Sequence, residues 1–405
     1  MNPWLSILLV LTSLGGLIGA VHLSPLKSEV ARKAIHLGMG CICLSFPWLF
    51  HTAWPVDLLA ALATLTLLAL RFLKPAVGQV LHNIARRSIG ELLFPIGVAL
   101  VFRLSDGVNS LYLPAVAILT FGDSAGALIG RQFGKHQYRT NAGTKSIEGS
   151  SAVFFVSALI VFILGKHQDL PSALLTALVA GLFIAMAEGI LSAGVDNLIL
   201  PITTYALLYF LRDLSLPELF SRIGIISVLA SILFFVRKIT SLNGGGLLSV
   251  MIFGYLSLAL GGPSFLIAPA ILFTIHLLTS WRAQELRSME HSADAVAAVV
   301  IPGLIWITLK TSSQYPESTC YTGFTITLMA QVALLHAATR RFLEKRSCRV
   351  MGLIKTSATG IALTPLWLAP ALAIPISLGA IQLGALNRIE QSVLSFIVSL
   401  PILFL

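Results

Sequence analysis

Charged side chains are scarce in this sequence. Asp, Glu, Lys and Arg make up only 11% of the 405 residues, whereas an average soluble protein has about 25%. Hydrophobic residues account for 56%, and apolar runs long enough to cross a hydrocarbon core of about 30 Å as a helix recur along the chain. The shortage of charge therefore excludes a soluble globular protein and predicts a polytopic integral membrane protein.

The apolar runs also lack the alternation of polar and apolar residues that marks the strands of a membrane β-barrel. We therefore predict an all-α membrane fold with about fifteen transmembrane helices, of which residues 352–405 supply about two or three. Residues 1–24 have no basic segment ahead of their apolar run, so we expect them to form the first membrane helix rather than a cleaved signal.

Cysteine is rare as well. Cys41 and Cys43 fall within a predicted membrane helix, and Cys320 and Cys348 fall in predicted loops. Their spacing matches neither a zinc site nor a disulfide framework. We expect these side chains to pack rather than to bind metal.

Basic residues outnumber acidic ones, 27 against 17, which gives a net charge of +10. When alternate loops are assigned to opposite sides of the membrane, most Lys and Arg fall on one side. The positive-inside rule makes that side cytoplasmic and places the N-terminus outside. A basic charge distributed in this way indicates orientation in a membrane and not a nucleic-acid partner.

Acidic residues within or beside the predicted helices lie mainly in the first half of the chain. Such acids are costly in a bilayer and usually functional. We therefore expect a catalytic membrane domain over residues 25–212 and an accessory, non-catalytic domain over residues 213–405. The acids concerned are Glu91, Asp123, Glu148, Glu188 and Asp196.

Residues 121–155 interrupt the apolar sequence with the segment FGDSAGALIGRQFGKHQYRTNAGTKSIEGSSAVFF. Its first glycines recur every four residues, which places them on one helix face and predicts close packing against a neighbouring helix. They are Gly122, Gly126, Gly130 and Gly134.

Asp123, Arg131 and Lys135 form the adjoining stripe of that helix, with the acid deepest and the bases at the cytoplasmic end. The stripe fits an internal salt bridge, or a metal ligand beneath a phosphate clamp. Mg²⁺ prefers one or two carboxylates, with water and substrate phosphate oxygens completing its shell. We favour the metal ligand because other membrane acids accompany Asp123.

The polar segment continues as a loop over residues 135–146 before a new helix begins near Ile147. Free N–H groups at a helix start favour an anion, and a lysine there adds a full positive charge. The loop is not a Walker A motif, because it lacks a glycine directly before the lysine. The residues expected to lie near phosphate are Gly143, Thr144, Lys145 and Ser146.

Further polar groups are predicted on the same membrane side. Asp196 and Asn197 begin a helix, where such residues are often only N-caps. Asp196 could also join Asp123 at a metal ion, or accept a proton from a substrate hydroxyl. Lys33 could simply anchor a helix at the interface, whereas His36, one turn deeper, is harder to explain in that way.

Four motifs, in order, cover roughly residues 25–211. They are Glu29, Arg32-Lys33 and His36, followed by FGDSAGALIGRQFGKH, TKSIEGSSAVF and VDNLILPI. Together they resemble the family of dolichol kinase, phytol kinase and the CTP-dependent diacylglycerol kinase of yeast, a group often labelled with phosphatidate cytidylyltransferases. As an ordered set they are fairly specific.

The resemblance implies transfer of the γ-phosphoryl group of a nucleotide, usually CTP, to the hydroxyl of a membrane lipid alcohol such as a polyprenol, phytol or diacylglycerol. Mg²⁺ is the implied cofactor, since phosphoryl transfer needs positioning and charge neutralisation rather than a covalent nucleophile. We expect the protein in a bacterial inner membrane, with its active site facing the cytoplasm, where nucleotides are.

The resemblance also implies roles for individual residues. Asp123 and Asp196 would hold the metal or act as general base, and Lys145 would act on the phosphates as a catalytic cation. Other nucleotide and phosphate contacts would come from Arg131, Lys135, Gly143, Thr144, Ser146, Glu148 and Gly149, with Lys33, His36, Glu188 and Asn197 as supporting polar residues.

Two other functions compete with a lipid kinase. A phosphatidate cytidylyltransferase usually pairs Lys-Asp with a following His-Gly-Gly and an Asp-Arg-x-Asp element, whereas this chain has Lys-Ser-Ile-Glu-Gly-Ser and Val-Asp-Asn. An ion-coupled transporter would place polar groups near the midplane in both of its repeats, whereas here they gather at the cytoplasmic ends of one half. Both comparisons favour the kinase.

Overall fold

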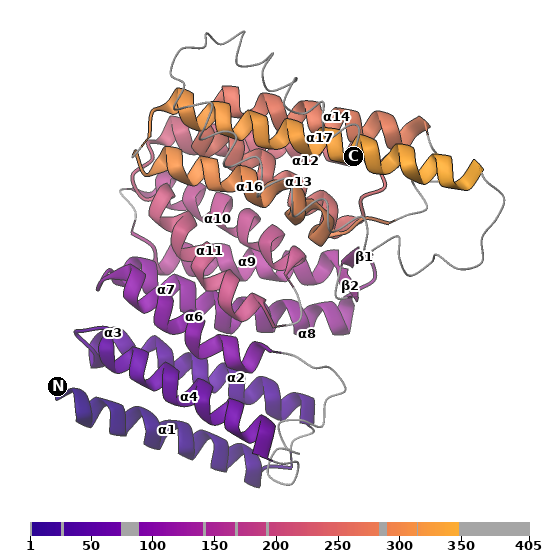
Figure 1. Cartoon of the computed structure of the whole chain (residues 1–405). Helices are drawn as coiled ribbons and strands as arrows, with labels where there is room; N and C mark the ends of the chain where they lie inside the picture. Colours follow the sequence, from indigo (N-terminus) through magenta and orange to yellow (C-terminus); the bar gives the residue numbers. More distant parts are fainter. Residues whose placement is uncertain are drawn as a thin grey trace. The chain divides into compact units, whose positions relative to one another are not determined.

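The structure is a computed structural model, and Figure 1 shows it as a cartoon coloured from the N-terminus to the C-terminus. The described residues are almost entirely helical, with a single two-stranded sheet among them. Residues 352–405, for which we predicted the last membrane passes, lie outside the described part. The described ranges are 2–25, 28–73, 89–140, 143–166, 169–191, 194–282, 290–313 and 315–347.

The chain divides into two compact units, Met1–Gly224 and Ile225–Leu405. The first unit contains every residue predicted for the site. Its helical elements are α1 (Pro3–Leu23), α2 (Ser28–Leu44), α3 (Phe46–Leu49), α4 (Trp54–Leu73), α6 (Gly90–Ser105), α7 (Asn109–Ala117), η1 (Ile118–Gly122), α8 (Asp123–Phe133), α9 (Ile147–Leu164), α10 (Leu170–Ile190) and α11 (Asp196–Leu211). Helix α12 (Leu216–Val236) crosses the division between the units.

The second unit is helical too, and its core is built around Phe265, Phe324 and Trp306. Our prediction that residues 213–405 are an accessory domain stays a prediction. The described elements of this unit are α13 (Gly244–Leu256), η2 (Ser257–Gly261), η3 (Pro263–Leu266), α14 (Ile267–Arg282), α16 (Ala293–Thr311) and α17 (Glu317–Ser347).

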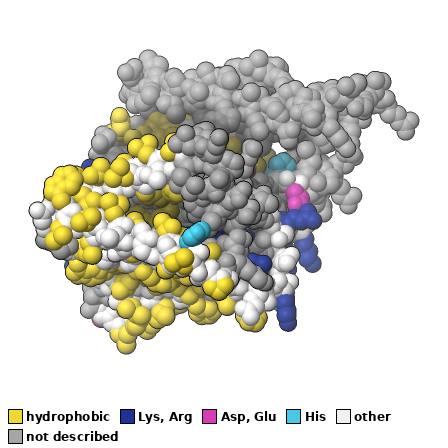
Figure 2. Space-filling view, turned by 90° about the horizontal axis from the view of Figure 1, so that it is seen from below, with side chains coloured by type: hydrophobic (Ala, Val, Ile, Leu, Met, Phe, Trp, Pro, Cys, Tyr) yellow, Lys and Arg dark blue, Asp and Glu magenta, His cyan; other side chains and the backbone are white. Residues whose placement is uncertain are grey.

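Eight helices in the described part of the chain are long and apolar enough to cross a membrane, and two shorter apolar helices accompany them. Large hydrophobic side chains such as Trp4, Phe155 and Phe235 are exposed on their surfaces. Figure 2 shows hydrophobic side chains over most of the coloured face, with Lys and Arg gathered toward one side of it. The helical fold agrees with a polytopic membrane protein; the number of about fifteen helices and the outward N-terminus are not confirmed.

Successive helices of the first unit run back and forth, as Figure 1 shows. The beginnings of α2, α6, α9 and α11 therefore lie at the same end as the last turns of α8 and α10. This arrangement brings together segments that are far apart in the sequence.

Helices α7 and α8 are joined by the single π-helical turn η1, so that Asn109–Phe133 forms one continuous membrane-length helix. The N–H group of Asp123 donates to the carbonyl of Ile118, five residues back. Such π turns are rare and frequently occur at functional sites. The turn therefore helps to set the direction in which the Asp123 side chain projects from the helix.

The glycines of α8 face α9. A Cβ atom on Gly126 would lie 2.5 Å from Val153 Cγ2, and one on Gly149 would lie 2.9 Å from the carbonyl oxygen of Gly126. The two backbones approach closely because neither position carries a side chain. The predicted packing role of the glycine stripe is confirmed.

The segment predicted as a loop over residues 135–146 instead contains a β-hairpin, and that part of our prediction was wrong. Strands β1 (Gln137–Thr140) and β2 (Gly143–Ser146) pair antiparallel, with Tyr138 opposite Lys145. Tyr138 and Thr140 in β1 and Thr144 in β2 favour extended backbone. The pairing also gives hydrogen-bond partners to backbone N–H and C=O groups in the segment between α8 and α9.

Candidate active site

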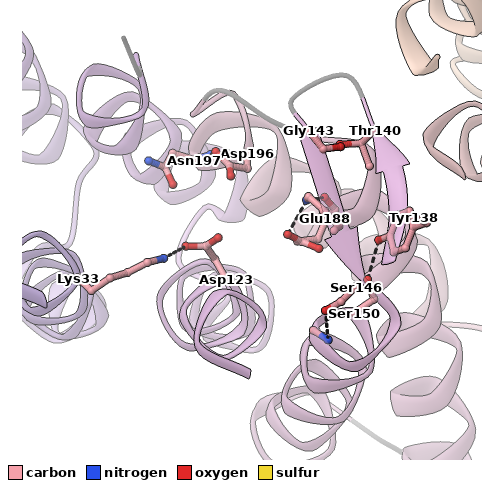
Figure 3. A network of polar contacts seen from close by, with 12 residues as sticks. Lys33, Asp123, Tyr138, Thr140, Gly143, Ser146, Ser150, Glu188, Asp196 and Asn197 are labelled. Carbon is pink, nitrogen blue, oxygen red and sulfur yellow. Dashed lines mark hydrogen bonds and ion pairs between the residues drawn. The ribbon is translucent and has the colours of Figure 1, made fainter. Parts of the chain in front are cut away.

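Polar side chains from α2, α8, the hairpin, α10 and α11 meet at one end of the first unit, as Figure 3 shows. Asp123 lies between Lys33 on one side and Glu188 on the other, and Asp196 lies beside it. The structure thus brings together groups that the sequence separates widely.

Lys33 and Asp123 form the first ion pair of this cluster. Lys33 Nζ lies 3.0 Å from Asp123 Oδ2, and the two side chains keep only 15% and 17% of their surface exposed. Asp123 is therefore paired with a residue of α2 and not with Arg131 of its own helix. A partly buried carboxylate needs such a partner, because burial without one disfavours its charge.

His36 supports Asp123 from the same helix as Lys33. Its Nε2 lies 3.2 Å from the carbonyl oxygen of Leu119, within the π turn, and 3.9 Å from Asp123 Oδ2. The ring also packs edge-on against Phe94, with centroids 5.1 Å apart. Donation to the Leu119 carbonyl fixes the ring next to the carboxylate. Its supporting role stays a prediction.

Lys145 and Glu188 form the second ion pair. Lys145 Nζ lies 2.6 Å from Glu188 Oε1 and also donates to the backbone carbonyl of Glu188. That carbonyl belongs to the last turn of α10, where the helix dipole favours a cation. The ammonium group is thus held by a carboxylate and by a helix C-terminus together.

Asp196 is the first residue of α11, and its Oδ1 accepts the N–H of Asn197 at 3.0 Å. The side chain of Asn197 donates to the Gly90 carbonyl at 2.8 Å and so ties the start of α11 to the start of α6. Asp196 forms no ion pair with another described residue, but its charge interacts with those of Asp123 and Glu188.

The charges of this cluster do not cancel. Three carboxylates face two ammonium groups, so one negative charge remains when His36 is neutral. In the described residues, no three His, Cys, Asp or Glu side chains are close enough to share one metal ion. The donor set fits Mg²⁺, which takes one or two carboxylates and fills its shell with water and phosphate oxygens.

Arg131 and Lys135, predicted to contact phosphate, lie at the same end of the unit with exposed side chains. Neither forms an ion pair with another described residue, and both remain available to an anion. Gly143 and Thr144 are exposed on the hairpin. Their roles in binding stay predictions.

Two side chains make polar contacts at the start of α9, where we predicted anion binding; that role stays a prediction. Ser146 Oγ accepts the N–H of Gly149 at 3.1 Å, and Glu148 places a carboxylate in the first turn. Glu148 accepts hydrogen bonds from the backbone N–H of His136 at 3.2 Å and lies 2.7 Å from His136 Nδ1. Ser146 therefore caps α9, and Glu148 connects α9 to the residue before β1.

Tyr138 belongs to this site and was missed by the sequence analysis. Its hydroxyl lies 2.7 Å from Ser150 Oγ. Burial of the ring, together with the nearby charge of Glu188, raises the pKa of Tyr138 to about 12. Only the strand pairing places Tyr138 beside Lys145, and that pairing was not visible in the sequence.

The chain is similar to a lipid kinase. Over 213 residues it is 29% identical to the phytol kinase of Synechocystis sp., an alignment that spans 49% of this chain and 88% of that protein. No protein-family model and no solved structure matches the sequence. The similarity supports, at a general level, the resemblance to the dolichol and phytol kinase family and a phosphotransferase that uses an alcohol as acceptor.

Proposed function

We propose that this protein transfers the γ-phosphoryl group of CTP to the hydroxyl group of a membrane lipid alcohol, at the cytoplasmic ends of the helices of its first unit. The observation that carries the proposal is the meeting of Asp123, Asp196 and Glu188 with Lys33 and Lys145 at one end of that unit. The similarity to a phytol kinase supports a lipid alcohol as the acceptor.

Asp123 and Asp196 are the residues that would hold Mg²⁺, which supplies neutralisation of phosphate charge when it is bound. Lys145 lies across the cluster from Lys33 and contacts the transferred phosphate, with Arg131 and Lys135 on the outer phosphates. The alcohol oxygen forms a bond to the γ-phosphorus as the bond from that phosphorus to the β–γ bridging oxygen breaks. The alcohol proton passes to water, and CDP leaves.

The surroundings of the site suit two different substrates. The helices below it expose apolar side chains to the bilayer, so a long alcohol can remain in the membrane with its hydroxyl at the interface. The nucleotide reaches the site from water, past the exposed Arg131 and Lys135. This arrangement keeps the hydrocarbon of one substrate apart from the phosphates of the other.

The test uses purified full-length protein with Mg²⁺, a panel of prenols, phytol and diacylglycerol, and CTP labelled at either the α or the γ phosphate. Label from the γ position on the lipid is the expected result. Label from the α position on a phosphatidate acceptor identifies a cytidylyltransferase instead, and absence of both refutes the proposal. ATP and UTP in parallel reactions determine whether CTP is preferred.

A further inference from the structure

The hairpin formed by β1 and β2 carries Lys145 into the site. Its register places Tyr138 directly opposite Lys145. Directly opposed residues in an antiparallel pair project from the same face, with Cβ atoms about 4.5–5.5 Å apart. The position at which Tyr138 is held therefore determines where the Lys145 side chain begins.

Tyr138 is held from its far end by α9. The hydrogen bond between the Tyr138 hydroxyl and Ser150 Oγ joins the side chain of the second residue of β1 to this helix, as Figure 3 shows. The base of the hairpin is joined to the same helix, because the N–H of Ile147 donates to the carbonyl of His136 at 2.9 Å. The hairpin is thus attached to α9 at two separate points.

Holding the Lys145 ammonium group in one place has an entropic cost. A lysine has many rotamers and loses that freedom when its ammonium group is held in one place. The hairpin backbone must therefore bring the ammonium group close to its target. A misplacement of about 1 Å can lower the rate of an enzyme roughly a hundredfold.

We propose that Tyr138 is a positioning residue: its hydrogen bond to Ser150 holds the hairpin on α9 so that Lys145 reaches the phosphates of the bound nucleotide. This inference rests on the proposed function for the identity of the ligand. Tyr138 acts through Lys145 and needs no contact of its own with the nucleotide. Its hydroxyl remains protonated at neutral pH, since its pKa of about 12 lies far above that range.

The first experiment removes only the hydroxyl group. Tyr138→Phe should lower kcat/KM for CTP about five- to tenfold, the range expected for one lost neutral hydrogen bond. KM for the lipid alcohol and the thermal midpoint should stay unchanged. Ser150→Ala should give the same defect, and the double variant should be no worse than either single one. Tyr315→Phe, at an exposed tyrosine of the second unit, is the matched control.

The second experiment asks whether Tyr138 acts through Lys145. Binding of a fluorescent CTP analogue is measured for Lys145→Gln with and without Tyr138→Phe. A change below about twofold on adding the second substitution supports the proposal, because two residues that act as a unit are not additive. An additive loss of affinity overturns it, and so does Tyr138→Phe with wild-type kinetics or with only a lowered thermal midpoint.

The binding measurement distinguishes a failure of this inference from a failure of the proposed function. A wild-type protein that binds the nucleotide but phosphorylates no lipid refutes the proposed function and leaves the binding test of Tyr138 intact. A wild-type protein that binds no nucleotide overturns both.

Discussion

Lys145 Nζ lies 2.6 Å from Glu188 Oε1, which joins the hairpin to the last turn of α10 across 43 positions of sequence. The pair of Lys33 and Asp123 makes the equivalent connection between α2 and α8. Each lysine neutralises a carboxylate. Under the proposed function, a bound metal ion and phosphates would offer each partner a new group of opposite charge, so both pairs could exchange partners without leaving a charge unpaired.

Replacing Asp123 by Asn should abolish most of the activity. The change keeps the size of the side chain but removes the charge that pairs with Lys33 and that we assign to Mg²⁺. We expect turnover to fall at least about a hundredfold, since even indirect support of a metal is commonly worth about ten- to a hundredfold and a ligand should be worth more. Lipid phosphorylation by purified protein is the measurement.

The matched control is Asp57→Asn. Asp57 lies in the first turn of α4 and pairs with Arg103 in a more exposed ion pair outside the candidate site. Its loss should leave turnover unchanged. An Asp123→Asn protein with wild-type turnover would remove the central assignment of the site.

We expect activity to require a positively charged side chain at position 145. Lys145→Met is expected to lower kcat by about a hundred- to a thousandfold, because a cation aimed at developing charge is lost. Lys145→Arg should retain part of the activity, since it keeps the charge but changes the geometry. Lys238→Met, at an exposed lysine of the second unit, should have no effect; equal losses in all three variants would contradict a specific role.

Asp196 should control the affinity for the metal. In Asp196→Asn, the Mg²⁺ concentration that gives half-maximal activity should rise at least about tenfold, with activity partly recovered at high Mg²⁺. The loop residue Asp106, which adopts a left-handed conformation that Asn also tolerates, provides the control Asp106→Asn. A Mg²⁺ titration that matches the wild type in Asp196→Asn would place the metal elsewhere.

The contact between α8 and α9 should not tolerate a methyl group. Gly126→Ala would bring a Cβ atom to 2.5 Å from Val153 Cγ2, and overpacking of this kind costs about 1–3 kcal/mol. A lowered thermal midpoint is expected, with recovery on adding Val153→Ala. Gly16→Ala on α1, where a Cβ atom meets nothing within 4 Å, should be neutral or slightly stabilising.

Some features of the site were predictable because they depend on neighbours in the chain. The four-residue spacing of glycines predicted that α8 packs closely on a neighbour, and Gly126 and Gly149 confirm it. The hairpin was not predictable in the same way, because its strands are four residues each and their pairing has no hydrophobic periodicity to reveal it. Tyr138 was missed for that reason alone.

The sequence by itself determined that this protein is helical and built for a membrane, and that its polarity is concentrated in the first half. Those properties follow from the composition of local runs and from the cost of placing charge in hydrocarbon. Only the tertiary structure decided that Lys33 pairs with Asp123 and Lys145 with Glu188, and that Asp196 has no ion-pair partner among the described residues. Ion pairs between distant helices depend on how the helices pack and rotate, and the π turn before Asp123 sets part of that rotation.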